Sequence, residues 1–216
     1  DGYIYFTRFD NMVAVTNGLD QTDHQLLQES IRNRYPVSIS LGTGLSQTPA
    51  TALEKATSRV QAAGSAQDGG RTEVLSGEYL DTQARCADDV QIAHFDVNDA
   101  TGKYTDQLSE FDSYIQIEQG YATLMRYLRE THGGLSFFVG GDNIIAVNPE
   151  LDESAYESAI SHVRAEANVE LKVGVGISKH AHGAGMQAKH ALEHCRHDGS
   201  IVEIDHSEEP AEAVGD

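Results

Sequence analysis

One short pattern occurs twice in this chain and constrains its fold more than any other feature. Residues 137–147 read Phe-Phe-Val-Gly-Gly-Asp-Asn-Ile-Ile-Ala-Val, which is two apolar stretches around a Gly-Gly-Asp-Asn turn. Two glycines supply the positive φ angles that a tight hairpin requires, so the pattern predicts a β-hairpin with Asp142 at its tip. The apolar flanks place this hairpin inside a sheet, which would hold Asp142 on a rigid support.

The same pattern opens the chain. Aligning residues 9–15 with residues 141–147 gives an offset of 132 residues, so that Asp10 and Asn11 repeat Asp142 and Asn143. Each copy is predicted to continue with a helix, a strand and a second helix, at 22–34, 37–45 and 49–63 in the first copy and at 153–166, 170–177 and 184–197 in the second. The chain therefore contains an internal duplication.

The second copy begins with a β-α unit that the first copy lacks. A strand over residues 90–95 ends at Asp96 and is followed by a loop and a long amphipathic helix over 109–131, all before the hairpin. The order β-α-β-β-α-β is the ferredoxin-like, or split βαβ, arrangement, so the predicted fold class is α+β with two tandem ferredoxin-like units. By the same comparison, the first unit has lost its opening strand and helix, and the natural protein is expected to be longer by about 40 residues.

The expected domain boundaries follow from these elements. The 216 residues are enough for two units that each bury a core. The predicted segments are an incomplete first unit at 1–64, a polar linker with a short helix around 72–84 at 65–89, a second unit at 90–205, and an acidic tail, expected to be disordered, at 206–216.

The composition excludes several classes of partner. The chain has 34 acidic and 15 basic residues, and only five of the basic ones are lysines. Such a surface repels phosphate backbones and anionic lipids, so we expect neither a nucleic-acid partner nor a membrane. It is typical of proteins from salt-loving archaea, where salt screens the self-repulsion. Because Cys86 and Cys195 make no disulfide framework and no stretch approaches about 20 apolar residues, the expected location is cytoplasmic.

The predicted fold brings two carboxylates together. In a split βαβ sheet the first strand is a neighbour of the central hairpin, which places Asp96 at the strand end beside Asp142 at the hairpin tip. Adjacent carboxylates repel each other unless a cation neutralises them, and hard oxygen ligands favour Mg²⁺ or Mn²⁺ over zinc. We therefore predict that Asp96 and Asp142 bind the metal ion and form the catalytic centre.

Further residues are predicted to bind the phosphates of a nucleotide. Thr101 and Gly102 lie in a turn whose backbone N–H groups could cradle phosphate beside the start of a helix. Lys179 and Arg196 could supply positive charge for a polyphosphate. A nucleoside triphosphate bound with metal ions fits this combination. The predicted nucleotide-binding residues are Asp10, Asn11, Thr101, Gly102, Asn143, Lys179 and Arg196.

Six blocks of sequence carry a resemblance to a known family. They are Phe-Thr-Arg-Phe-Asp-Asn at 6–11, Gln-Glu-Ser-Ile-Arg-Asn-Arg-Tyr-Pro at 28–36, Gly-Ser-Ala-Gln-Asp at 64–68, Gln-Ile-Ala-His-Phe-Asp at 91–96, Thr-Gly at 101–102 and Gly-Gly-Asp-Asn at 140–143. In this order they resemble archaeal GTP cyclohydrolase III. The strand ending in Asp, the long helix and the Gly-Gly-Asp hairpin also resemble the palm of nucleotidyl cyclases, GGDEF diguanylate cyclases and polymerases.

This resemblance implies a Mg²⁺-dependent enzyme, with Mn²⁺ as an alternative ion and K⁺ as a candidate monovalent cation. The implied reaction hydrolyses GTP to 2-amino-5-formylamino-6-(5-phosphoribosylamino)pyrimidin-4(3H)-one and phosphate, for archaeal riboflavin and F420 precursor synthesis. The resemblance also implies a homo-oligomer, either a dimer or a tetramer. The family's first copy opens with its own strand bearing an Asp, which this chain lacks.

Three alternatives remain open from the sequence. A nucleotidyl or diguanylate cyclase would use the same metal ions with a 3′-hydroxyl as nucleophile, although Asn143 stands where diguanylate cyclases carry Glu. A non-catalytic sensor would bind GTP without turnover. Three histidines at i, i+4 and i+7 of one helical face have a spacing that could bind zinc, namely His190, His194 and His197. Metal analysis would decide the last of these.

Overall fold

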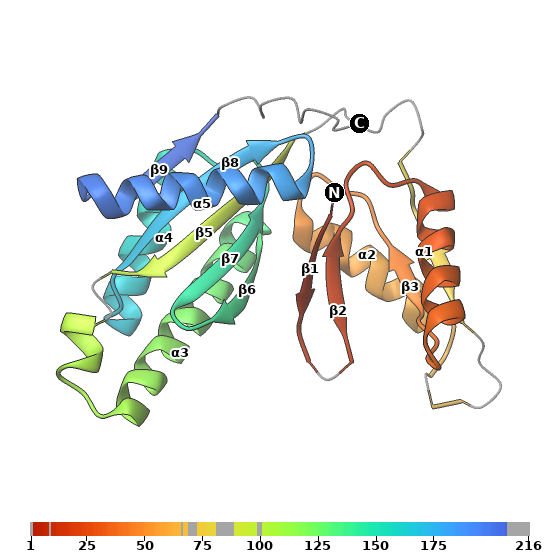
Figure 1. The fold of residues 1–216 in the computed structure, drawn as a ribbon, viewed down its shortest axis with the longest axis horizontal. Coiled ribbons are helices and arrows are strands. Elements are labelled where there is room, and N and C mark those ends of the chain that lie inside the picture. The colour runs from red at the N-terminus through yellow and green to blue at the C-terminus, as the bar shows by residue number, and fades with distance from the viewer. Residues whose placement is uncertain are drawn as a thin grey trace.

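A five-stranded sheet in the order β6-β7-β5-β8-β9 forms the centre of the second half of the chain (Figure 1). The structure is a computed structural model, and it describes residues 2–8, 10–65, 67–68, 73–80, 89–98 and 101–206. The strands are β5 (Val90–Val97), β6 (Leu135–Gly140), β7 (Asn143–Asn148), β8 (Leu171–Ser178) and β9 (Val202–Asp205). Three pairs of neighbouring strands are antiparallel, namely β6 with β7, β7 with β5, and β5 with β8. The last pair, β8 with β9, is parallel. A split βαβ unit produces this order when a fifth strand is added at its edge.

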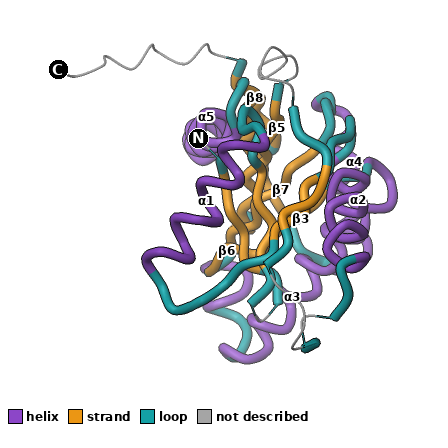
Figure 2. The backbone as a smooth tube through the Cα atoms, turned by 90° about the vertical axis from the view of Figure 1, so that its right-hand side faces the viewer, coloured by secondary structure: helices purple, strands orange, loops and turns teal. Residues whose placement is uncertain are grey.

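Helices cover both faces of this sheet (Figures 1 and 2). On one face lie α3 (Glu110–Tyr127), its π-helical continuation η2 (Leu128–His132) and α4 (Glu153–Ala167), and on the other face lies α5 (Ala181–Asp198). Successive side chains of β5 point to opposite faces, so Phe95 packs with α3 and α4 whereas Ile92 faces α5. Within the described residues, none of these helices has the length and apolar character needed to cross a membrane.

Two glycines of β8 allow α5 to lie directly on the sheet. A Cβ atom at Gly174 would stand 2.1 Å from the backbone nitrogen of Leu192, and one at Gly176 would stand 2.1 Å from the carbonyl oxygen of Ala184. Neither position tolerates a side chain without moving the helix away from the strands. This close approach lets Arg196, near the end of α5, reach Asp96 on β5.

The first half of the chain forms two separate two-stranded sheets (Figure 1). The first is an antiparallel hairpin of β1 (Tyr3–Phe6) and β2 (Met12–Val15), and the second is a parallel pair of β3 (Leu41–Thr43) and β4 (Leu75–Gly77). Helix α1 (Gln21–Arg34) lies between β2 and β3 in the chain, and helix α2 (Pro49–Ala62) lies between β3 and β4. The predicted strand over 37–45 is therefore much shorter than expected, and the two predicted helices are present.

The linker between the halves differs from its prediction. A short helix was expected around 72–84, but residues 75–77 form strand β4 instead. The carbonyl oxygen of Val74 accepts hydrogen bonds from the backbone of Leu41 at 2.7 Å and from Nε2 of Gln28 at 2.9 Å. These contacts with distant residues override the local helical preference. The end of the predicted helix, with Cys86, lies outside the described residues, as does the predicted tail beyond residue 206.

Aromatic rings join the β1–β2 hairpin to the larger sheet. Tyr5 is buried and stacks on Phe137 of β6 with ring centroids 4.3 Å apart, while Tyr3 stacks on Tyr5 at 5.7 Å. The ring of Tyr3 also lies against Gly185 of α5, where a Cβ atom would stand 2.4 Å from it. The hairpin and α5 thus share one apolar cluster on the same face of the sheet.

Matching positions in the two halves make similar contacts. Gly42 lies directly against α2, since a Cβ atom at this position would stand 2.2 Å from the carbonyl oxygen of Ala56. Gly174, which is 132 residues later, lies against α5 in the same way. The antiparallel pair β1–β2 corresponds to β6–β7, and the parallel pair β3–β4 corresponds to β8–β9. In the second half β5 lies between these two pairs. Among the described residues of the first half, no strand occupies that place.

Candidate active site

Two carboxylates meet at one end of the five-stranded sheet. Asp96 lies near the end of β5 and is only 4% exposed, and Asp142 lies at the tip of the β6–β7 hairpin. The register of β5 with β7 places Asp96 opposite Asn143, the residue after Asp142. The negative charge of Asp96 acts on Asp142 and helps to raise the pKa of its carboxyl group. The structure therefore brings together the two residues that the sequence analysis selected as a pair.

The hairpin tip depends on its two glycines. Gly140 has a φ angle of 115° and Gly141 has a φ angle of 63°, and both values lie in a region that residues with a side chain rarely adopt. The turn they form projects Asp142 back towards the end of β5. This is the role that the Gly-Gly-Asp-Asn pattern predicted for them.

Two cations bind Asp96. Arg196 of α5 donates to its Oδ2 atom from Nε at 3.3 Å and from Nη2 at 3.1 Å. Lys172, which pairs with Asp96 across the β5–β8 ladder, places Nζ 3.4 Å from the same oxygen. The Lys172 side chain is 14% exposed, so water screens this contact little. The charge of Asp96 is therefore balanced by the protein itself.

Asp142 has a different electrostatic environment. Its side chain is half-buried, and burial together with the negative charge of Asp96 raises its pKa above the usual value for an aspartate. Asn143 donates from Nδ2 to Oδ1 of Asp142 at 3.1 Å. A further positive charge, placed between the two carboxylates, would remove the repulsion that helps to raise this pKa. The pair of carboxylates is thus suited to bind a cation.

His94 and Lys172 are site residues that the sequence analysis missed. His94 lies two residues before Asp96 on the same face of β5, and its Nε2 atom is 2.9 Å from Oδ1 of Asn143. Burial lowers the pKa of His94, which favours the neutral imidazole. Because side chains two residues apart in a strand share one face, the sequence could have placed His94 on the same face as Asp96. Lys172 could be found only from the strand register, which the sequence does not specify.

Lys179 does not lie where the prediction placed it. It follows the far end of β8 and forms an ion pair with Asp89 at 2.7 Å. Because β8 is antiparallel to β5, Ser178 pairs with Val90 at the start of β5, and Lys172 pairs with Asp96 near its end. Lys179 is therefore roughly 20 Å from the carboxylates along the strand. The prediction that Lys179 contributes charge beside them is wrong, and Lys172 occupies that place.

Thr101 and Gly102 open a short π-helical turn, η1 (Thr101–Thr105), that follows the end of β5. The carbonyl oxygen of Gly102 accepts a hydrogen bond from Nε2 of Gln107 at 2.7 Å. Lys103 forms an ion pair with Glu170 at 2.5 Å, and this bond lowers the pKa of Glu170. The turn is thus at the same end of the sheet as the carboxylates. Residues 99 and 100 of the predicted phosphate-binding turn lie outside the described residues.

The tip of the β1–β2 hairpin repeats the hydrogen bonds of the β6–β7 tip. Nδ2 of Asn11 donates to the carbonyl oxygen of Arg8 at 3.0 Å and to the carboxylate of Asp10 at 3.5 Å. Asn143 makes the same two bonds, to the residues one and three positions before it. Asp10 and Asn11 are exposed and belong to a separate sheet. The first tip therefore shares the local geometry of the second without a described strand beside it.

The histidine face of α5 is exposed at all three positions, His190, His194 and His197. Within the described ranges, no three His, Cys, Asp or Glu side chains converge as a metal-binding group. Cys195, on the same helix, is buried and donates from Sγ to the carbonyl oxygen of Val173 at 3.5 Å. The described side chains therefore do not form the alternative zinc site.

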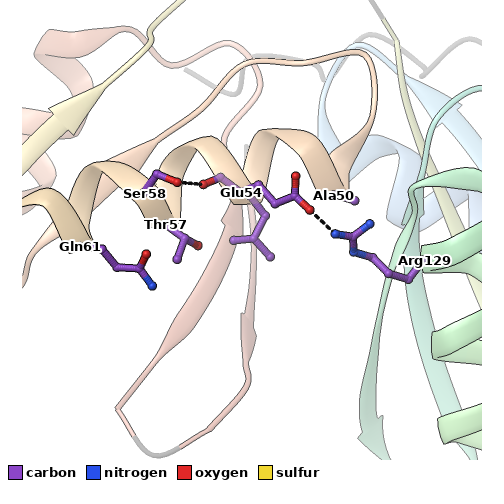
Figure 3. A pocket seen from close by; sticks show the side chains of 7 residues that line it. Ala50, Glu54, Thr57, Ser58, Gln61 and Arg129 are labelled. Atoms are coloured by element: carbon purple, nitrogen blue, oxygen red, sulfur yellow. Dashed lines mark hydrogen bonds and ion pairs between the residues drawn. The ribbon is translucent and has the colours of Figure 1, made fainter.

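A shallow pocket lies on α2, away from the carboxylates, and Figure 3 shows its lining. Arg129 of η2 reaches across it and forms an ion pair with Glu54 of α2. Nearby, the backbone N–H of Ala50 donates to the carbonyl oxygen of Gly133 at 2.9 Å. These contacts hold the two halves together. The pocket contains none of the predicted site residues.

At the end of the sheet, the carboxylate pair could hold a divalent metal ion, and the adjacent cations could contact a phosphorylated substrate. The chain belongs to the GTP cyclohydrolase III family, whose model matches residues 1–207. This membership confirms the resemblance seen in the sequence.

Curated relatives and solved structures show the following similarities. GTP cyclohydrolase III of Natronomonas pharaonis is 64% identical over 203 residues, which cover 94% of this chain and 80% of that protein. The protein of the same name from Halorubrum lacusprofundi is 59% identical, covering 94% and 79%, and that from Methanocaldococcus jannaschii is 39% identical, covering 94% and 73%. The GGDEF domain of DgcB from Caulobacter crescentus in complex with c-di-GMP matches 56% of this chain and 78% of that chain, with 15% identity and a TM-score of 0.46.

Proposed function

We propose that this chain is a GTP cyclohydrolase that converts GTP to 2-amino-5-formylamino-6-(5-phosphoribosylamino)pyrimidin-4(3H)-one with release of phosphate. This product would serve archaeal riboflavin and F420 precursor synthesis. Membership of the GTP cyclohydrolase III family supports the choice of substrate. The observation that carries the proposal is the placement of Asp96 opposite Asn143, next to Asp142, with Lys172 and Arg196 bound to Asp96.

Mg²⁺, or Mn²⁺ in its place, is the ion that the carboxylate pair fits. Both ligand groups are hard carboxylate oxygens, which these ions prefer. Lys172 and Arg196 both contact Oδ2 of Asp96, so Oδ1 is the atom that could face the ion together with the carboxylate of Asp142. When bound, the ion supplies Lewis-acid stabilisation of charge on the phosphoryl oxygens.

Arg196 and Lys172 supply positive charge for the triphosphate. The side chain of Arg196 is 38% exposed, and its planar guanidinium can donate two parallel hydrogen bonds to a phosphate. Lys172 is more buried and acts as a point charge at the start of β8. Because both already bind Asp96, they also hold this carboxylate in position.

The proposed reaction contains two kinds of hydrolysis, which can be followed separately. Phosphate is released by attack of water on phosphorus, a step that depends on positioning and on electrostatic stabilisation. The imidazole ring opens when water adds at C8 of guanine and the C8–N9 bond breaks, with the formyl group kept on the pyrimidine product. Parallel measurement of phosphate and of the pyrimidine therefore distinguishes this enzyme from a simple GTPase.

The test is incubation of the chain with GTP and Mg²⁺, with both products followed over time. We expect both to form, to stop on chelation of the metal, and to fall by about 100-fold or more in Asp142→Asn. Asp152→Asn is the matched control, because Asp152 caps α4 at the other end of β7 and asparagine caps a helix equally well. A cyclic nucleotide product, or GTP binding without any product, would overturn the proposal.

We also propose that the chain forms a homo-oligomer. The N-terminal part of α3 exposes Phe111, which is 69% exposed, together with Tyr114 and Ile115. A second copy of the chain would cover this apolar surface. Sedimentation in molar KCl, where charge repulsion is screened, should give the mass of a dimer or a tetramer. A monomer under these conditions would contradict the proposal.

Finally, we infer that the two halves are copies of one ferredoxin-like palm unit. The repeated hydrogen bonds at the hairpin tips, the equivalent glycines under α2 and α5, and the matching strand pairs support this inference. The units would comprise residues 1–64 and 90–205. In this arrangement the first copy has no counterpart of β5 among its described residues.

A further inference from the structure

His94 contacts the hairpin tip, but the proposed roles of the carboxylates and cations do not use it. The register of β5 with β7 pairs His94 with Ile145 and Asp96 with Asn143. His94 therefore lies diagonally across the ladder from Asn143, at a spacing that long side chains can bridge. Its Nε2 atom is 2.9 Å from Oδ1 of Asn143. This is a good hydrogen-bond distance between two partly buried groups.

The side-chain amide of Asn143 has one orientation that satisfies its neighbours. Its Nδ2 atom donates to Oδ1 of Asp142 at 3.1 Å and points to the carbonyl oxygen of Gly140 at 3.5 Å. An ionised carboxylate and a carbonyl group accept hydrogen bonds and cannot donate them. The amide nitrogen must therefore face the tip, and the amide oxygen must face His94. That oxygen needs a donor, and an imidazole with its proton on Nε2 supplies one.

We propose that His94 is a positioning residue for Asp142. Its Nε2–H group fixes the Asn143 amide, and the amide in turn fixes the direction in which the Asp142 carboxylate faces Asp96. This inference rests on the proposed function, because it assigns Asp142 to hold the divalent ion. Hydrogen bonds behind a metal ligand set the orientation of its lone pairs and typically change metal affinity by 10- to 100-fold when removed.

The first hairpin supplies an internal comparison. Asn11 makes the equivalent bonds, so the tip geometry alone is enough to bring the amide to the carboxylate. Asn11 is exposed, however, and its bond to Asp10 is 3.5 Å, whereas the corresponding bond of Asn143 is 3.1 Å. The bond to the carbonyl oxygen differs in the opposite sense, at 3.0 Å for Asn11 and 3.5 Å for Asn143. At the tip where an imidazole contacts the amide, the amide therefore lies closer to the carboxylate and farther from the carbonyl group.

A first experiment reads the proposed bond directly. Long-range ¹H–¹⁵N NMR correlations of the metal-free chain, near neutral pH, identify which ring nitrogen of His94 carries the proton. We expect the Nε2–H tautomer. The Nδ1–H tautomer would reverse the amide of Asn143 and would overturn the proposal. This readout does not depend on enzyme turnover or on any bound ion.

A second experiment measures the effect on the ion. His94→Met and His94→Gln introduce side chains of similar length, but only glutamine can donate to Asn143. Binding of Mn²⁺, followed by electron paramagnetic resonance, should weaken about tenfold in His94→Met and stay within about threefold of the unmodified chain in His94→Gln. His162→Met is the control, because His162 stacks on Tyr127 on the other face of the sheet. It should leave Mn²⁺ binding unchanged.

The outcomes separate this inference from the proposed function. Equal Mn²⁺ affinity in His94→Met, His94→Gln and the unmodified chain would overturn the positioning role. Failure of the unmodified chain to bind Mn²⁺ would overturn the proposed metal site, while the tautomer of His94 still tests its bond to Asn143. Thermal unfolding of the two variants shows the packing loss that they share. Restored affinity in the glutamine variant alone is a result that packing does not explain.

Discussion

Lys172 and Asp96 face each other across the β5–β8 ladder, with Nζ of the lysine 3.4 Å from Oδ2 of the aspartate. Arg196 contacts the same oxygen, so two cations surround one carboxylate of the site. Asp142, the other carboxylate, faces the charge of Asp96 and has a raised pKa. The pair therefore contains one aspartate with two cationic partners and one with a raised pKa, and substitutions at the two positions should behave differently.

Asp142→Asn is expected to stabilise the metal-free protein at neutral pH. Because the pKa of Asp142 is raised on folding, the folded protein holds this proton more tightly than the unfolded chain. The stability contributed by this group is therefore largest at low pH, falls as pH rises from the ordinary aspartate value through the raised one, and stays low above it. With metal chelated, the midpoint of thermal unfolding of the variant should exceed that of the unmodified protein at pH 7 but not near pH 3. The same difference at both pH values would contradict this.

Asp96→Asn is expected to destabilise the same protein, by about 1–3 kcal/mol, because Lys172 and Arg196 lose their shared partner. Lys172→Met should also cost stability, since Asp96 is almost fully buried. If the ion pair is the cause, the two effects overlap, and the double variant is more stable than their sum predicts. Denaturant unfolding of the four proteins measures this coupling. Additive effects would show that the contact contributes nothing.

Turnover should respond to the two aspartates as one unit. Asp96→Asn and Asp142→Asn are each expected to abolish most Mg²⁺-dependent phosphate release from GTP, because a single carboxylate does not fix the ion. The double variant should be little worse than either single one. Initial rates of phosphate and pyrimidine formation check both statements. Near-normal rates in both single variants would place the site elsewhere, and Asp10 in the first hairpin would be the next position to test.

Substitutions at two equivalent glycines should distinguish an effect on stability from an effect on GTP turnover. Gly174→Ala and Gly42→Ala should each lower stability by about 1–3 kcal/mol, since the new methyl group meets the backbone of the covering helix in both halves. Only Gly174→Ala moves α5, which carries Arg196. We therefore expect it to reduce GTP turnover well below that of Gly42→Ala, measured at a temperature where both variants are folded. Equal turnover would show that the close packing of α5 does not position the arginine.

The acidic surface predicts a salt dependence. With a net charge of −19, the folded chain repels itself, and KCl screens this repulsion. The midpoint of thermal unfolding should rise by several degrees between low and molar KCl. The same KCl series with the Asp96→Asn variant is the control. It removes the buried ion pairs of Asp96, whose charges salt screens less than those of the surface. A midpoint independent of KCl would mean that the surface charge does not govern stability.

The sequence predicted the parts of the site that depend on local patterns. Glycine spacing located both hairpin tips, and the order of strands placed Asp96 beside Asp142. Arg196 was also found, because the last turn of α5 follows from the helical period. Lys172 and Lys179 could not be told apart, since the choice between them depends on which end of β8 meets the end of β5. That relation belongs to the assembled sheet.

The linker shows a second limit of the same kind. Residues around 72–84 have a composition that suits a helix, yet Leu75 pairs with Leu41 and Val74 accepts a hydrogen bond from Gln28. These partners lie more than 30 residues away in the chain. The local sequence contains no information about these distant partners, so local helix propensity predicted a helix where the chain forms a strand. Contacts over such separations were predictable only where the internal repeat supplied a template.

The stacking of Tyr5 on Phe137 determines whether the two halves of this chain can be separated. If the halves were divided, Phe137 would be exposed to water on the strand that leads to the Gly-Gly-Asp-Asn turn, in a molecule whose apolar interior spans both pieces. Exposed aromatic surface of this kind favours aggregation. The second half is therefore a poor candidate for transfer to another protein by itself, even though it carries the carboxylate pair.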